Sequence, residues 1–213
     1  MIESSSGIIL RTRPLTETSL IVNWLTPELG RISTVAKGAR RPKSTFRGKL
    51  DLFYEADFSF QRSRRSELHA LREVKLLQTH APLRQEMGWL QQTSYAAALI
   101  EQTTERETPL TAIYGLMSGF LAELPRRSPQ PQTIFSFELK LLNELGLMPD
   151  LQSSRLTPGS RLIAEKLTSL DWPMAAMLKP SGAQSLEIEK FLYGFLAQHL
   201  EKIPKGRKAA LNT

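Results

Sequence analysis

The period of the hydrophobic pattern changes near residue 80, and this change limits the possible folds more than any other feature of the sequence. Before it, apolar and polar residues alternate with a period of two, most regularly from Leu52 to Phe60, which is typical of strands with one buried face. After it, apolar residues recur every three or four positions, most strongly from Ile188 to Leu200, as on one face of a helix. We therefore predict an α+β chain with a β domain over residues 1–80 and an all-α domain over residues 81–213.

The β domain is predicted to contain several short strands. Candidate strands cover residues 7–13, 20–25, a run that begins near Arg31, and 52–60. Residues 61–66 have the composition of a polar hairpin tip, and residues 67–77 suit either a last strand or the start of a helix. Several short strands within about eighty residues predict a small closed or partly closed barrel.

The second part of the chain carries five helical stripes. They lie at residues 89–100, 116–124, 134–145, 161–170 and 188–200. Thr108 and Pro109 have the pattern of an N-cap followed by a first-turn proline, and Ser181 with Gln184 has the spacing of a capping box. We expect these stripes to pack on one another as a helical core rather than to line a cofactor site.

Positive charge is concentrated in one stretch of the β domain. Residues 31–49 contain seven basic side chains and no acidic one, and Gly38, Pro42 and Gly48 interrupt the stretch, which predicts a loop. Residues 1–80 hold 14 of the 28 basic residues but only 8 of the 21 acidic ones. Such a localised positive charge indicates a polyanionic partner, which could be nucleic acid, an anionic membrane surface or an acidic protein. The alternative interpretation is a solvated run of charges on a surface loop.

A nucleic-acid site would use these cations together with an aromatic ring. The candidate phosphate contacts are Lys37, Arg40, Arg41, Lys43, Arg47 and Lys49. Arg62, Arg64 and Arg65 would extend the patch if the hairpin tip folds to the same side. Phe46 could stack on a base of a single strand, or it could anchor the loop to the barrel.

The sequence contains no motif that predicts catalysis. The three histidines, His69, His80 and His199, lack metal-ligand spacing, and no phosphate-binding glycine loop is present. Asp51, Glu55 and Asp57 could hold a divalent ion, but the strand period places Glu55 and Asp57 on the outer face as solvated residues. Cysteines are absent, which excludes disulfides and thiolate ligands. We therefore expect a protein that is not an enzyme and has no cofactor.

Nothing in the sequence predicts attachment to a membrane. No segment approaches the roughly 18 uninterrupted apolar residues of a membrane span, and residues 1–10 lack the pattern of a signal peptide. The basic cluster is not on an amphipathic helix either. We expect a cytoplasmic protein.

Several motifs resemble the RecO family of bacterial recombination mediators. The N-terminal motifs are Glu17-Thr18-Ser19-Leu20-Ile21, the turn from Thr26 to Gly30, the run Val35-Ala36-Lys37-Gly38-Ala39-Arg40, and the basic run from Lys43 to Leu50. In the second part, Phe137 to Leu142 followed by Leu145-Gly146 resembles the family's F-E-L-x-L-L-x-x-L-G helix end. Pro204 to Arg207 loosely resembles its closing segment.

The resemblance implies a fold, a function and a set of partners. It implies an N-terminal OB barrel followed by an all-α domain, and a DNA repair protein at the bacterial nucleoid. Such a protein binds single- and double-stranded DNA, anneals complementary strands, contacts the C-terminal tail of single-strand-binding protein (SSB), and helps RecR to load RecA. Many relatives carry a four-cysteine zinc site after the L-G helix end, whereas residues 149–160 here contain no cysteine. Zinc is therefore not expected, and packing alone must hold this loop.

A partner site and two rival functions complete the predictions. An acidic tail with an apolar end needs an apolar groove flanked by cations. The candidate residues for it are Arg126, Arg127, Phe137, Lys140 and Leu141; the alternative interpretation, that the apolar ones are core, is favoured for each of them taken singly. The first rival function is an RNA-binding OB protein of translation or ribosome assembly. The second is a nucleic-acid-modifying enzyme, which would need a polar pocket with perturbed titratable groups.

Overall fold

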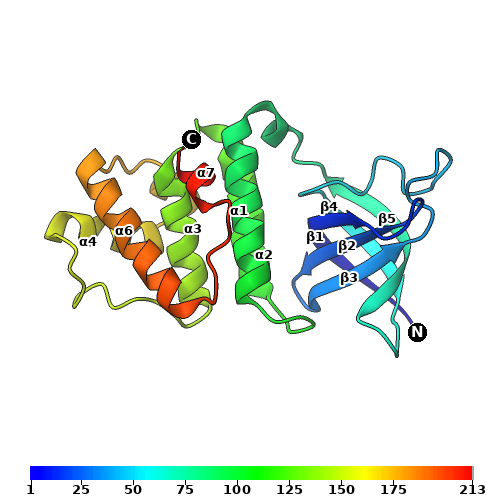
Figure 1. Cartoon of the computed structure of the whole chain (residues 1–213). Helices are drawn as coiled ribbons and strands as arrows, with labels where there is room; N and C mark the ends of the chain where they lie inside the picture. Colours follow the sequence, from blue (N-terminus) through cyan, green and yellow to red (C-terminus); the bar gives the residue numbers. More distant parts are fainter. Residues whose placement is uncertain (213) are drawn as a thin grey trace. The chain divides into compact units, whose positions relative to one another are not determined.

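The computed structural model describes residues 1–212 and contains two compact units (Figure 1). The barrel unit comprises residues 1–81 and 104–115, and the helical unit comprises residues 82–103 and those from 116 onward. The barrel unit is therefore discontinuous in sequence, because residues 104–115 return to it after the first long helix. None of the helices in the part of the chain described here is long and apolar enough to cross a membrane.

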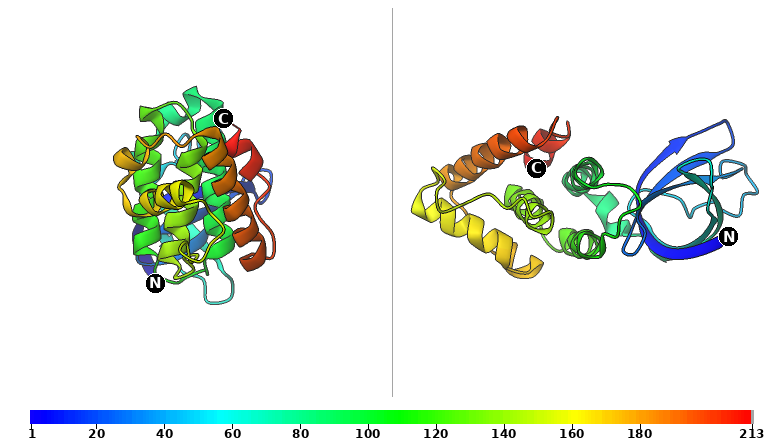
Figure 2. Two further views of the ribbon diagram at one scale, coloured as in Figure 1. Left: turned by 90° about the vertical axis from the view of Figure 1, so that its left-hand side faces the viewer. Right: turned by 90° about the horizontal axis from the view of Figure 1, so that it is seen from below.

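Five strands form the barrel. They are β1 (Ile2–Pro14), β2 (Leu20–Thr26), β3 (Gly30–Ala36), β4 (Glu55–Gln61) and β5 (Leu68–Gln78). The strand order β1-β2-β3-β5-β4 closes on itself, with β3 and β5 parallel and the other pairs antiparallel. The closed ring is visible end-on in Figure 2. This is the topology of the OB fold, which confirms the predicted fold class.

The strand period predicts the two faces of β4 correctly but not where the strand starts. Ala56, Phe58 and Phe60 are buried in the barrel, and the residues between them face outward. The alternation predicts a strand from Leu52, yet the strand begins at Glu55. Phe53 is almost fully buried rather than on the outer face, because its backbone turns with a φ of 65°.

The segment that suited either a strand or a helix is β5. Leu71 and Val74 both point into the core although they are three residues apart. The pairing with β4 shifts register here, since Phe60 pairs with Leu71 whereas Ser59 pairs with Glu73. The extra residue of this bulge gives an apolar spacing of three, which mimics a helix.

The barrel core is built around two stacked aromatic rings. Trp24 and Phe58 stack with centroids 4.0 Å apart at an interplanar angle of 14°. The buried indole N–H of Trp24 donates to the Thr34 hydroxyl at 2.9 Å. Because this polar atom is satisfied inside the barrel, the large ring can fill the core without an unpaired donor.

The remaining elements are helical. They are η1 (Ala81–Gln85), α1 (Met87–Thr103), α2 (Thr111–Glu123), η2 (Leu124–Arg126), α3 (Pro131–Glu144), α4 (Pro158–Ser169), α5 (Trp172–Ala175), α6 (Gly182–His199) and α7 (Arg207–Leu211). In the helical unit α3 packs against α1, α4, α6 and α7, and Figure 1 shows it between α1 and α6. The capping box of Ser181 and Gln184 at the start of α6 is confirmed. The cap predicted at Thr108 is wrong, because α2 begins at Thr111.

A buried ion pair ties the last helix to the middle of the helical unit. The Arg207 guanidinium on α7 donates to both carboxylate oxygens of Glu138 on α3, at 2.7 and 3.0 Å. The Tyr95 hydroxyl on α1 donates to the same carboxylate at 2.5 Å. Burial, followed by the negative charge of Glu138, raises the pKa of Tyr95 well above its ordinary value. The Phe137–Leu142 motif and the C-terminal motif are thus joined by one contact.

The cysteine-free loop between α3 and α4 is held by more than packing. Leu151 and Leu156 are buried, but side-chain carboxylates also bind the loop. Glu187 on α6 accepts hydrogen bonds from the Thr157 backbone N–H at 2.6 Å and from the Thr157 hydroxyl at 2.8 Å. Asp150 accepts from the Ser153 hydroxyl at 2.6 Å. The expectation that packing alone holds this loop is therefore wrong.

Candidate nucleic-acid interface

The basic stretch folds as a loop of successive turns between β3 and β4. We call residues 37–54 the basic loop. Backbone hydrogen bonds of 3.0 to 3.2 Å span three residues each, from Arg41 to Gly38, Ser44 to Arg41, Arg47 to Ser44 and Lys49 to Phe46. Gly38 and Gly48 adopt φ values of 69° and 70°, which glycine adopts without steric cost. The glycines that interrupt the stretch in the sequence thus make the turns.

Two phenylalanines fix the basic loop to the barrel. Phe46 is 8% exposed and belongs to the barrel core, and Phe53 is 1% exposed. The Phe53 backbone N–H donates to the Ile9 carbonyl on β1 at 2.8 Å. Of the two roles considered for Phe46, its burial in the barrel core favours the anchor.

The cations of the basic loop point to solvent. Lys37, Arg40, Arg41, Lys43 and Arg47 are exposed, and Lys49 is half-buried. The Arg40 backbone N–H donates to the Thr18 carbonyl at 3.0 Å, and its guanidinium donates to the Thr16 carbonyl at 3.3 Å. The structure thus brings these predicted contacts together on one anchored loop, which lies against the connection between β1 and β2.

Two further cations lie beside this surface and were missed in the sequence. Arg11 and Arg13 are exposed on β1 and pair with Asn23 and Ile21 of β2. Their neighbours Val22 and Trp24 belong to the core, so the two arginines share the outward face of the strands. The sequence did contain a signal for these two residues, because an Arg-x-Arg pattern inside a β-rich run places both charges on one face of the strand.

The three arginines of the β4–β5 connection do not form one set with the basic loop. The basic loop enters β4 at Glu55, whereas this connection leaves β4 at its other end, after Gln61. Arg64 and Arg65 are exposed. Arg62 instead contacts two carboxylates, Glu3 at 2.7 and 2.9 Å and Glu107 at 2.7 Å. These contacts raise the pKa of Arg62 above its ordinary value, chiefly through the hydrogen bond with Glu3.

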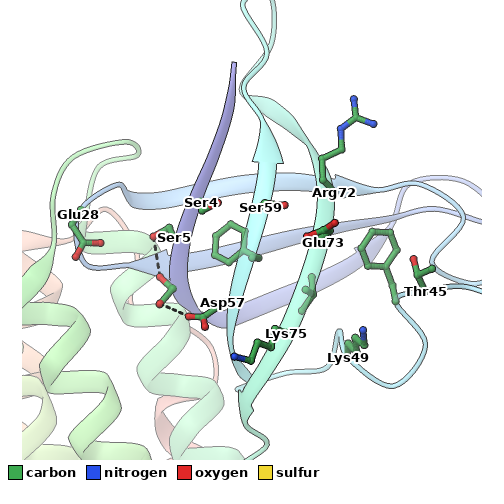
Figure 3. Close-up of a pocket in the computed structure, with 14 residues that line it drawn as sticks. Ser4, Ser5, Glu28, Thr45, Lys49, Asp57, Ser59, Arg72, Glu73 and Lys75 are labelled. Carbon is green, nitrogen blue, oxygen red and sulfur yellow. Dashed lines mark hydrogen bonds between the residues drawn. The ribbon is translucent and has the colours of Figure 1, made fainter.

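One hollow on the barrel unit has balanced charges. It has a volume of about 910 Å³ and lies along β1, β4, β5 and the basic loop (Figure 3). Its charged lining residues are Lys49, Arg72, Lys75, Glu28, Asp57 and Glu73. Three cations and three acids give no net attraction for a phosphate chain, so the cationic loop, and not this hollow, has the character of a nucleic-acid surface.

The predicted partner site is mostly core. Phe137 and Leu141 are buried inside the helical unit. The Lys140 ammonium donates to the carbonyls of Thr168, at 2.8 Å, and Leu170, and burial lowers its pKa. The remaining candidates, Arg126 and Arg127, lie 3.5 and 3.9 Å from the Glu123 carboxylate. These five residues therefore do not form an open apolar groove in this conformation.

Metal binding is not indicated by the side chains. Among residues 1–212, no three His, Asp or Glu side chains come together as a possible metal site. His80 and Tyr114 both contact Glu55, at 3.8 and 2.6 Å. The nearby His80 ring, followed by the hydrogen bond from Tyr114, lowers the pKa of Glu55.

A closed five-stranded barrel with a cationic loop, followed by a helical unit, defines the class of OB-fold proteins with an appended all-α domain. Two family models match the chain in this order. The model described as "Recombination protein O N terminal" matches residues 1–80, and "Recombination protein O C terminal" matches residues 92–158. The chain belongs to the RecO family, which confirms the resemblance seen in its motifs.

Curated relatives give the same assignment. The chain is 30% identical over 148 residues to the DNA repair protein RecO of Anaeromyxobacter dehalogenans (strain 2CP-C), covering 70% of this chain and 58% of the relative. It is 28% identical over 151 residues to that of Bacillus subtilis (strain 168), covering 71% and 58%. It is 29% identical over 181 residues to that of Cyanothece sp. (strain PCC 7425), covering 84% and 60%. The matched regions thus span about three fifths of the length of these relatives.

Proposed function

We propose that this protein acts in DNA repair by binding single- and double-stranded DNA through the cationic surface of its barrel unit. The observation that carries the proposal is the set of exposed cations on the basic loop, which Phe46 and Phe53 hold in a defined conformation. Phosphate neutralisation by such side chains releases condensed counterions, which favours binding of either nucleic-acid form. The RecO relatives named as DNA repair proteins support the same role.

The chemistry proposed for it is annealing of complementary strands without covalent catalysis. Cations that screen the repulsion between two phosphate backbones lower the barrier to base pairing. Such a step needs no nucleophile, no general base and no cofactor, so we propose that the protein is neither an enzyme nor a zinc protein. We place it in the bacterial cytoplasm at the nucleoid.

We further propose that it works with the partners its family membership implies. These are the C-terminal tail of SSB, RecR and RecA, with the protein helping to load RecA on SSB-coated DNA. The helical unit supports a role in partner contact, since Leu162, Met177 and Tyr193 are large apolar side chains exposed on it.

An annealing assay tests the proposal. Complementary oligonucleotides are coated with cognate SSB, with or without the terminal tail of that protein, and duplex formation is followed over time. We expect acceleration that requires the tail. No acceleration on bare or coated strands would contradict the annealing role, and preferential capture by structured RNA in a competition assay would favour the RNA-binding alternative.

A further inference from the structure

A short segment packs on the barrel and brings an acidic side chain to the β4–β5 connection. We call residues 104–110 the return segment. Its Glu107 backbone N–H donates to the Arg31 carbonyl on β3 at 3.1 Å, and its Leu110 N–H donates to the Pro27 carbonyl at 2.9 Å. A Cβ atom on Gly30 would lie 1.8 Å from the Thr108 carbonyl oxygen. The return segment is therefore in direct backbone contact with the β2–β3 turn.

The Glu107 carboxylate of this segment lies between two donors. One oxygen accepts from the Arg62 guanidinium at 2.7 Å, and the other lies 3.3 Å from His69 Nε2. Glu107 adopts a φ of 54°. This is a left-handed backbone conformation, which residues other than glycine and asparagine adopt only at a cost in free energy.

His69 is a buried donor directed at this carboxylate. Its ring is 2% exposed and stacks on Phe60, with centroids 5.3 Å apart. Its Nδ1 accepts a hydrogen bond from the Ser63 backbone N–H at 3.3 Å, so in the neutral ring Nε2 carries the proton. That buried Nε2 forms no well-aligned hydrogen bond with any residue from 1 to 212. A buried donor without an acceptor destabilises the folded protein, and a ligand that supplies the acceptor removes this cost in free energy.

We propose that Arg62 and His69 form a site for one phosphate group of a nucleic-acid strand, and that Glu107 occupies this site in the free protein. The inference rests on the proposed DNA-binding function. Carboxylate and phosphate oxygens accept from the same donors, and a guanidinium is well suited to both. Exchange of one anion for the other keeps an acceptor for the Arg62 guanidinium and supplies one for His69 Nε2, which lacks a hydrogen bond among residues 1–212 of the free protein.

The surroundings permit this exchange. The Glu107 side chain is 42% exposed, so its carboxylate can turn into solvent while the backbone contact with Arg31 is kept. Arg64 and Arg65 are exposed on the same connection and would contact the phosphates on either side. Glu107 thus sets how strongly the β4–β5 connection takes part in binding.

The test compares charge-neutralising variants on a fluorescent single-stranded oligonucleotide across a salt series. Glu107→Gln keeps the shape of the side chain and removes its charge. We expect binding to tighten about tenfold, the factor of one charge-assisted hydrogen bond, and the slope of log K against log salt to steepen by about 0.7 for one more phosphate contact. Glu107→Asn serves as a second variant, because asparagine tolerates the left-handed backbone.

Two controls decide the outcome. Glu105→Gln removes the same charge from an exposed neighbour on the return segment, and it should change affinity much less. Adding Arg62→Ala to Glu107→Gln should abolish the gain. Equal effects of Glu105→Gln and Glu107→Gln, or a gain that survives without Arg62, would overturn the site while leaving DNA binding intact. Failure of the wild-type protein to bind any oligonucleotide would overturn the proposed function as well.

Discussion

The Arg207 guanidinium and the Glu138 carboxylate are the two charges buried most completely in the helical unit, at 6% and 0% side-chain exposure. Burial alone would lower the pKa of Arg207, but hydrogen bonds and the charge of Glu138 raise it above its ordinary value. Removing one partner of such a pair leaves the other charged and unpaired in the interior. Arg207→Ala should therefore reduce the free energy of unfolding by about 3 to 5 kcal/mol, measured by urea denaturation.

A neighbouring residue provides the matched control for this prediction. Lys205→Ala removes an exposed charge two positions away and should change stability by less than about 0.5 kcal/mol. The double variant Glu138→Leu with Arg207→Met should recover much of the loss, because no unpaired charge remains. Equal stabilities for Arg207→Ala and Lys205→Ala would show that the buried pair does not stabilise the unit.

One acidic side chain on α6 helps to hold the loop between α3 and α4. Hydrogen bonds from Ser160 and from the backbone and side chain of Thr157 lower the pKa of Glu187. A lowered carboxyl pKa stabilises the folded loop above the ordinary pKa of glutamate, and this stabilisation is lost as the pH falls through the lowered value. Glu187→Ala should therefore speed hydrogen exchange of the Thr157 amide at neutral pH, measured by NMR or mass spectrometry.

Acidification should act on the same amide. In the wild-type protein its protection, after correction for the intrinsic exchange rate, should fall as Glu187 becomes protonated, and Glu187→Ala should show no such fall. Glu201→Ala, which removes an exposed acid just beyond α6, should leave the Thr157 amide protected. Unchanged protection in Glu187→Ala would mean that the buried Leu151 and Leu156 suffice to hold the loop.

Local patterns in the sequence predict the elements of this fold well where one face of an element is buried. The alternation in β4 and the stripe of α3 place their core residues correctly, whereas in the stripe of α6 only Ile188, Leu192 and Leu196 are core. The pattern is ambiguous in β5, because a bulge next to Arg72 changes the apolar spacing. The basic loop is recognisable from its glycines and charges, whereas the burial of Phe46 depends on packing that no local pattern shows.

The whole molecule contains features that no local pattern reveals, because they join distant parts of the chain. Residues 104–115 belong to the barrel unit although helical sequence precedes and follows them. Arg62 is predicted as a DNA contact from its charge, yet its partners Glu3 and Glu107 lie 59 and 45 positions away. The apolar residues of the predicted partner site, Phe137 and Leu141, are core because four other helices cover α3.

The salt dependence of single-stranded DNA binding tests the central claim, that the exposed cations of the basic loop bind the phosphate chain. With about five phosphate contacts, the slope of log K against log salt should be roughly −3.5. Replacing Arg40, Arg41 and Lys43 together by alanine should flatten the slope by about 2 and weaken binding to all sequences alike. The control variant replaces three exposed lysines of the helical unit, Lys179, Lys190 and Lys208, and should keep the wild-type slope. An unchanged slope in the loop variant, or equal flattening in both variants, would contradict the claim.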